Sequence, residues 1–203
     1  MGKLKQEGRN CVLDWLQQAD QAVLFWIQSL HTEWLDGIMV FVTSIGNYRM
    51  VWLIMGMVLL LFPRYRRYGI LLMVGIAIGY LLGDLVLKQL VARPRPFVMW
   101  PTIELLIPQP HGYSFPSGHA LSSFAAATAL FLADRRLGIP AYGLAILIAL
   151  SRSYLFVHYP VDILTGALLG VVISIGLYRF GKRFGFLRAG DPKRKSQEND
   201  GIR

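Results

Sequence analysis

Three short polar segments interrupt an otherwise apolar sequence, and their side chains are of the kinds that bind and cleave phosphate. The first runs from Lys88 to Pro96 and carries a lysine and two arginines. The second is Pro-Ser-Gly-His at residues 116–119, and the third, from Ser151 to Asp162, adds an arginine, a histidine and a carboxylate. Fixed cations neutralise phosphoryl oxygens, and a histidine oriented by a carboxylate is a nucleophile. The three segments together predict a site that holds a phosphate and hydrolyses it through histidine.

The first segment offers cations on a stiff backbone. Pro94 and Pro96 flank Arg95, and a guanidinium held in place suits bidentate phosphate binding. Lys88 stands near the end of an apolar run, where a lysine also reaches the membrane interface without any catalytic role. Taken alone, this segment, including Arg93, fits a solvated loop better than a binding site.

The second segment stands just before an apolar run. We expect Pro116 at the first helical position, with the free amides of Ser117, Gly118 and His119 at a helix N-terminus, which is a natural anion site. Gly118 lets the backbone approach an oxyanion closely. An ordinary helix cap with a surface histidine explains the same residues.

The third segment is the most specific of the three. Arg152 falls near the end of a membrane helix, where an unpaired charge is costly. Pro160 is expected to begin the last helix, so that Asp162 lies in its first turn and reaches back to His158. A carboxylate on one ring nitrogen fixes the tautomer and leaves the other nitrogen as a nucleophile. The alternative is a helix-start aspartate beside a packed histidine.

The composition places these segments in a membrane protein. Of 203 residues, 54% are hydrophobic and 16% are charged, whereas a soluble domain has about 25% charged residues. Several apolar runs approach the roughly 20 residues that a membrane helix needs. The net charge of +9 is carried mostly by short loops and the C-terminal tail. That distribution argues against nucleic acid as a partner and for membrane lipids around the chain.

We therefore expect an all-α, polytopic bundle of six transmembrane helices, or five if residues 12–30 lie in the interface. Residues 12–30 are apolar on one side and polar on the other, and both alternatives stay open. The further apolar runs cover residues 34–62, 68–91, 117–132, 138–156 and 160–180, with a break at 46–49 in the first of them. Residues 1–180 would form the membrane domain, and residues 181–203 a basic, disordered cytoplasmic tail.

Basic loops predict the orientation of the bundle. Arginines and lysines gather at residues 64–67, 135–136 and 182–195, and such clusters favour the cytoplasmic side. The helices between them would carry residues 88–119 and 151–160 to the opposite face. We therefore expect a multi-pass protein of the cell membrane, with its site on the extracytoplasmic face.

Taken together, the pattern Lys-x6-Arg-Pro, Pro-Ser-Gly-His and Ser-Arg-x5-His-x3-Asp resembles the signature of the type 2 phosphatidic acid phosphatase superfamily. The match has no departure at Lys88, Arg95, Pro96, Pro116, Ser117, Gly118, His119, Ser151, Arg152, His158 and Asp162. It extends over roughly residues 20–180 and is strongest to bacterial membrane phosphatases of two kinds, phosphatidylglycerophosphatase B and the undecaprenyl pyrophosphate phosphatases.

The resemblance implies a role for each matched residue. His158 would form a phosphohistidine with Asp162 orienting it, and His119 would act as the general acid. The phosphoryl oxygens would be bound by Lys88, Arg95, Ser117, Gly118 and Arg152. No cofactor and no metal are expected, because fixed cations neutralise the phosphoryl group and the sequence has no cluster of carboxylates.

These roles imply a lipid phosphatase that converts phosphatidylglycerol phosphate to phosphatidylglycerol, undecaprenyl pyrophosphate to undecaprenyl phosphate, or both. Two alternatives are kept. A non-catalytic lipid-binding or transport protein would be expected to have a damaged motif, and this motif is intact. A lipid phosphotransferase would pass the phosphoryl group to an acceptor other than water, so its phosphate release would depend on that acceptor.

Overall fold

The computed structural model describes residues 2–187, with side chains from Trp15 onward. Every regular element in this part of the chain is helical, as expected. In chain order these are α1 (Gly2–Gln28), α2 (Glu33–Ile45), η1 (Asn47–Arg49), α3 (Met50–Leu61), α4 (Arg66–Gly79), η2 (Tyr80–Leu87), α5 (Lys88–Val91), α6 (Pro96–Met99), α7 (Gly118–Ala133), α8 (Arg135–Tyr154) and α9 (Pro160–Arg183).

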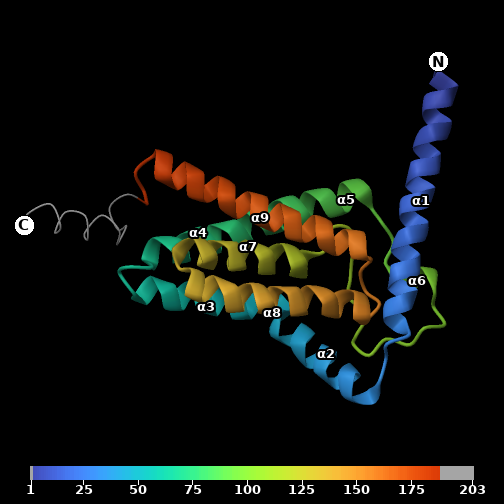
Figure 1. Ribbon diagram of the computed structural model, residues 1–203, viewed down its shortest axis with the longest axis horizontal. Helices are drawn as coiled ribbons and strands as arrows, with labels where there is room; N and C mark the ends of the chain where they lie inside the picture. The colour runs from blue at the N-terminus through green and yellow to red at the C-terminus, as the bar shows by residue number, and fades with distance from the viewer. Residues whose placement is uncertain (1, 188–203) are drawn as a thin grey trace, which may run out of the picture.

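Helix α7 forms the centre of the bundle, and α4, α8 and α9 pack around it (Figure 1). Five of its six alanines are buried, and glycines on the neighbouring helices bring the backbones close together. A Cβ added to Gly170 of α9 would lie 2.3 Å from the carbonyl oxygen of Leu121, and one added to Gly79 of α4 would lie 2.1 Å from Cδ2 of Leu121. Small residues of this kind permit tight helix packing in lipid. The start of α7 is thereby fixed between its neighbours.

Three helical stretches are long and apolar enough to cross a membrane, namely Arg66–Met99, Arg135–Tyr154 and Pro160–Arg183. A fourth candidate is the pair formed by Glu33–Ile45 and Asn47–Leu61, which is bent by 44°. Helix α7 is apolar but shorter, with 16 residues. The multi-pass architecture is therefore confirmed, whereas the expected total of six spans is not.

The predicted break at residues 46–49 is confirmed as the short 3-10 turn η1. Tyr48 and Arg49 have φ values of 51° and 62°, in the left-handed region that side-chain-bearing residues seldom adopt. The turn redirects the chain between α2 and α3, which are bent by 44° at this break.

Two helix starts differ from the expected ones. Helix α7 begins at Gly118, so Pro116 precedes the helix, because the hydroxyl of Ser117 caps it by accepting from the amide of Ala120. Helix α8 begins at Arg135, not at residue 138, because the carboxylate of Asp134 caps it by accepting from the amide of Arg136 at 2.9 Å. Such side-chain caps satisfy the free amides of a first turn.

Two helix ends also differ from the expected ones. Helix α8 stops at Tyr154, two residues before the expected end, and α9 continues to Arg183, past residue 180. The rest of the expected tail, from residue 188 to residue 203, lies outside the described residues.

Helix α1 runs across the end of the bundle, nearly perpendicular to α7, α8 and α9 (Figure 1). It is not among the helices that qualify as membrane spans. Its buried Leu24 packs against Phe156 and Tyr159 in the loop between α8 and α9, while Trp26 is exposed. Helix α1 therefore packs on the loop that carries the third polar segment.

The three polar segments meet at one end of the bundle. There α5 ends, α7 begins and the loop between α8 and α9 turns (Figure 1). The basic loops between α3 and α4 and between α7 and α8 lie at the other end, as does the end of α9. The prediction that the polar segments share one face is therefore confirmed.

Candidate active site

His158 lies in the tight loop between α8 and α9, with a side chain only 2% exposed. Its Nδ1 is 3.6 Å from Oδ2 of Asp162 and 3.3 Å from the hydroxyl of Ser114. Pro160 begins α9 as expected, and Asp162 accepts from the amide of Tyr159 at 3.0 Å. The predicted approach of Asp162 to the imidazole is therefore present. Ser114, which donates to the same carboxylate at 2.5 Å, was not predicted.

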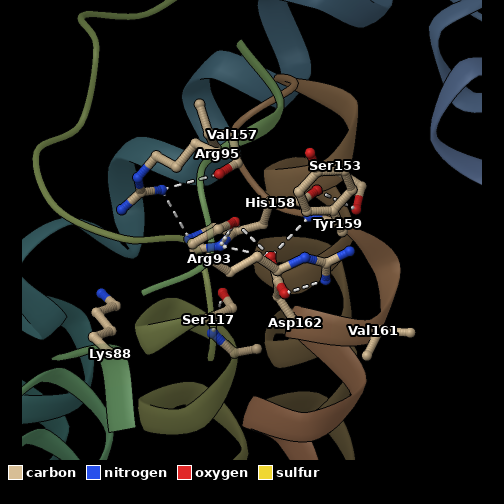
Figure 2. A network of polar contacts seen from close by, with 12 residues as sticks. Lys88, Arg93, Arg95, Ser117, Ser153, Val157, His158, Tyr159, Val161 and Asp162 are labelled. Carbon is tan, nitrogen blue, oxygen red and sulfur yellow. Dashed lines mark hydrogen bonds and ion pairs between the residues drawn. The ribbon is translucent and has the colours of Figure 1, made fainter. Parts of the chain in front are cut away.

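The other ring nitrogen faces Arg95 (Figure 2). Nη1 of Arg95 is 3.2 Å from Nε2 of His158 and donates to the carbonyl of Val157 at 2.9 Å. The carbonyls of Gly112 and His111 hold the rest of the guanidinium, at 2.8 and 3.2 Å. A guanidinium can only donate, so Nε2 must be the acceptor in this contact. Burial lowers the pKa of His158 to about 3. The neutral ring therefore carries its proton on Nδ1 and keeps a lone pair on Nε2.

Arg93 connects the pair formed by His158 and Asp162 to helix α1. Its Nη1 donates to Oδ1 of Asp162 at 2.7 Å, and its Nη2 donates to Oδ2 of Asp20 at 2.6 Å. Oδ1 of Asp20 accepts from the amide of Val161 at 2.9 Å. The guanidinium also lies over the ring of Tyr159, 3.8 Å from its centroid. Arg93 is thus a structural partner of Asp162, and the solvated-loop interpretation of Arg93 was wrong, because two carboxylates and a ring enclose it.

A cavity of about 140 Å³ opens beside His158. Six of the predicted site residues line it, which are Lys88, Arg95, Gly118, His119, Arg152 and His158. Asp162 lies behind His158 and does not line the cavity. Ser117 does not line it either, because its hydroxyl caps α7 and its amide donates to the carbonyl of Asp162 at 3.0 Å. Ser117 therefore ties the second segment to the third.

Arg152 is buried in the wall of this cavity. Its Nη1 donates to the hydroxyl of Thr43 at 2.5 Å, but its buried Nε has no hydrogen-bond partner. Among the described residues, the other buried side-chain atom of this kind is Nε of Arg49, which also lines the cavity. An unpaired buried donor is costly.

Asp84 balances part of the positive charge. It pairs with Lys88, with Nζ 2.5 Å from Oδ1. Its Oδ2 accepts from Nη2 of Arg49, a partner that was not predicted. The lining therefore holds four cations, Lys88 and three arginines, against this one carboxylate. In the described part of the chain, no group of three or more His, Cys, Asp and Glu side chains is placed to bind a metal.

The sequence matches the PAP2 superfamily over residues 68–186. An undecaprenyl-diphosphatase of Sulfolobus acidocaldarius is 40% identical over 141 residues, which cover 69% of this chain and 68% of that relative. An undecaprenyl-diphosphatase of Bacillus subtilis is 31% identical over 156 residues, which cover 75% of this chain and 78% of that relative.

Among solved structures, the fold is similar to a transmembrane PAP2 type phosphatidylglycerolphosphate phosphatase from Bacillus subtilis. The TM-score is 0.69 at 25% identity, and the match covers 83% of this chain and 87% of the other.

Proposed function

The chain belongs to the PAP2 superfamily and is a membrane lipid phosphatase, and from this premise we propose that it hydrolyses undecaprenyl pyrophosphate to undecaprenyl phosphate through a phosphohistidine on His158. The observation that carries the proposal is the lone pair on Nε2 of His158 at a cavity lined by four cations. The names of the two relatives support a polyprenyl diphosphate as substrate. Phosphatidylglycerol phosphate is the second candidate, supported by the solved structure.

In the first step, the terminal phosphoryl group of the lipid diphosphate enters the cavity. Arg95, Arg152 and Lys88 neutralise its oxygens, and Nε2 of His158 attacks the phosphorus. As the N–P bond forms, the bond to the bridging oxygen breaks and its electron pair stays with undecaprenyl phosphate. His119 gives that oxygen a proton. Phosphoryl transfer depends mainly on positioning and charge stabilisation, which these cations provide without a metal or cofactor.

In the second step, a water molecule attacks the phosphohistidine. His119 takes the proton of that water, the N–P bond breaks, and inorganic phosphate leaves with the lone pair restored to Nε2. Asp162 keeps the proton of His158 on Nδ1 throughout and stabilises the positive ring that exists while Nε2 carries the phosphoryl group.

The site is proposed to face the extracytoplasmic side of the cell membrane. The support is the distribution of basic residues, since the clusters at 64–67, 135–136 and 182–183 lie at the end of the bundle away from the cavity.

The test is phosphate release by the purified full-length protein in detergent with EDTA. Undecaprenyl pyrophosphate and phosphatidylglycerol phosphate are compared side by side. We expect release from the diphosphate with the higher kcat/KM, no effect of EDTA, and an alkali-stable labelled phosphoenzyme with substrate labelled in its terminal phosphate. His158→Ala should lower kcat by about 10⁴-fold or more, and no labelled phosphoenzyme should form.

His31→Ala is the matched control, because His31 stacks on Tyr154 and does not line the cavity. Equal release by wild type and His158→Ala would refute the histidine mechanism. Release from phosphatidylglycerol phosphate alone would transfer the proposal to the second substrate. Release that rises with added lipid or sugar alcohols would identify a phosphotransferase.

A further inference from the structure

Arg49 lines the cavity but belongs to none of the three polar segments. It projects from the η1 turn, where it and Tyr48 hold left-handed backbone conformations that cost free energy for residues with side chains. The structure maintains this turn between α2 and α3, and the turn delivers a guanidinium to the site.

The surroundings of Arg49 hold it in place without satisfying it. Its Nη2 donates to Asp84, and its guanidinium lies 5.1 Å from the centroid of the Tyr80 ring. Its Nε is buried and has no hydrogen-bond partner, although the side chain as a whole is 24% exposed. Asp84 also accepts from Lys88, so this group of one carboxylate and two cations has a surplus of one positive charge.

The same group touches the backbone of the second polar segment. A Cβ added to Gly118 would lie 3.0 and 3.1 Å from the two carboxylate oxygens of Asp84 and 3.2 Å from Nη2 of Arg49. Glycine is what allows this approach. Arg49 and Asp84 therefore adjoin the start of α7, where free amides favour an anion. Asp84 itself sits in the π-helical turn η2, a distortion often found at functional sites.

We propose that Arg49, positioned by Asp84, binds the second phosphoryl group of a diphosphate substrate, the one that stays with the lipid, and so gives the site its preference for diphosphates over phosphomonoesters. This inference rests on the proposed function, in which His158 attacks the terminal phosphoryl group. His158, Arg95 and Arg152 then act on the terminal phosphoryl group, whose phosphorus is attacked. In phosphatidylglycerol phosphate the leaving group is an alcohol of glycerol, and the other phosphate is a diester separated from the reacting one by that glycerol. No phosphoryl group is therefore bonded to the leaving oxygen, where Arg49 would bind it.

The chemistry gives this extra cation a defined use. When the P–O bond of a diphosphate breaks, negative charge develops on the departing lipid phosphate, and a fixed donor at that position stabilises the charge. Arg49 lines the cavity with its Nη2 held by Asp84, and its Nε is buried without a hydrogen-bond partner. A planar guanidinium of this kind suits bidentate phosphate binding.

The test compares Arg49→Gln with wild type on undecaprenyl pyrophosphate and on phosphatidylglycerol phosphate. We expect kcat/KM for the diphosphate to fall about 10- to 100-fold, the effect of one charge-assisted hydrogen bond, with a change of less than about threefold for the monoester. Arg49→Lys, which keeps the charge, should recover part of the loss. Arg64→Gln removes an exposed arginine at the other end of the bundle and is the control.

A second measurement does not depend on hydrolysis. The thermal unfolding midpoint of wild type should rise more with inorganic pyrophosphate than with inorganic phosphate at equal concentration, and Arg49→Gln should lose that difference. If wild type fails to cleave undecaprenyl pyrophosphate, the proposed function fails, and this shift still decides the role of Arg49. If Arg49→Gln lowered kcat/KM equally for both substrates, or left the ratio of the two kcat/KM values unchanged, the inference would be overturned. It would also be overturned if the unfolding midpoint of Arg49→Gln still rose more with pyrophosphate than with phosphate.

Discussion

The two walls of the cavity differ in how completely their charges are paired. We call the first the histidine wall: Arg95 and His158, which line the cavity, together with Arg93, Ser114 and Asp162, which are bonded to one another behind His158. Each ionised group on it is bonded within the protein: Arg95 to three carbonyls, and Asp162 to Arg93, Ser114 and the amide of Tyr159.

We call the second the anion wall, made of Arg49, Asp84, Lys88, Gly118, His119 and Arg152. Two of its arginines keep a buried Nε without a partner, and its cations outnumber its one carboxylate, Asp84. The contrast indicates a division of work. In the proposed reaction, the histidine wall is organised before substrate arrives and costs no rearrangement, whereas the anion wall keeps the surplus positive charge that we propose a phosphate neutralises.

The largest effect is expected from Asp162→Asn, which disturbs the histidine wall at its centre. The amide no longer enforces a proton on Nδ1 of His158 and does not stabilise a positive ring, so kcat should fall about 10³- to 10⁴-fold, as when an orienting aspartate is lost from a catalytic triad. Steady-state kinetics on undecaprenyl pyrophosphate provide the measurement.

Binding separates this effect from misfolding. Because the anion wall is untouched, inorganic phosphate should still raise the unfolding midpoint of Asp162→Asn about as much as that of wild type. If Asp162→Asn lost both turnover and phosphate binding, the two walls would depend on each other. The proposed division of work between them would then be wrong.

Some of these contacts could be predicted from the sequence alone. Pro160 predicted the start of α9 and so placed Asp162 in its first turn, from which it reaches back to His158 in the preceding loop. The break at 46–49 was visible as a polar interruption of an apolar run. The basic loops along the chain predicted that the three polar segments lie at one end of the bundle.

Contacts between distant segments were out of reach. Asp20 and Arg93 are 73 residues apart, and nothing in either local pattern joins them. Arg49 is one of 21 lysines and arginines and carries no motif. The alternation of arginine and proline in Arg93-Pro94-Arg95-Pro96 was the available signal for Arg93, since it makes both arginines equally rigid. Ser117 shows the converse, because a cap residue and a phosphate ligand look alike in sequence.

On the anion wall, Arg152→Gln is expected to lower kcat/KM about 10²- to 10³-fold, the usual cost of removing one preorganised donor from a developing charge. The loss should appear for the diphosphate and the monoester alike, because Arg152 is assigned to the reacting phosphoryl group. That pattern contrasts with the substrate-selective loss expected of Arg49→Gln and is measured with the same two substrates.

Thr43→Val is the control for Arg152→Gln, since it removes the hydroxyl that accepts from Nη1 and leaves the guanidinium in place. It should change kcat/KM by less than about fivefold. If the valine variant lost as much activity as Arg152→Gln, Arg152 would be a packing residue and the anion wall would not include it.

The smallest effect on activity is expected from Asp20→Asn, which acts on the histidine wall from α1. Asparagine still accepts from the amide of Val161, but Arg93 loses one of its two carboxylates, and the remaining one is Asp162 itself. The free energy of unfolding should fall by about 1 to 3 kcal/mol, the cost of a buried donor left without its partner. With Asp162 drawn further toward Arg93, kcat should fall about 3- to 10-fold and KM should stay unchanged.

Asp36→Asn is the matched change, because Asp36 also joins two segments, through Tyr154 and His31, but touches neither wall. Both variants should lose stability in denaturation experiments, and Asp20→Asn alone should lose kcat. If the two variants kept equal kcat values, α1 would serve only to stabilise the fold. If Asp20→Asn raised KM and left kcat unchanged, α1 would act on the anion wall, and the division of work between the walls would have to be redrawn.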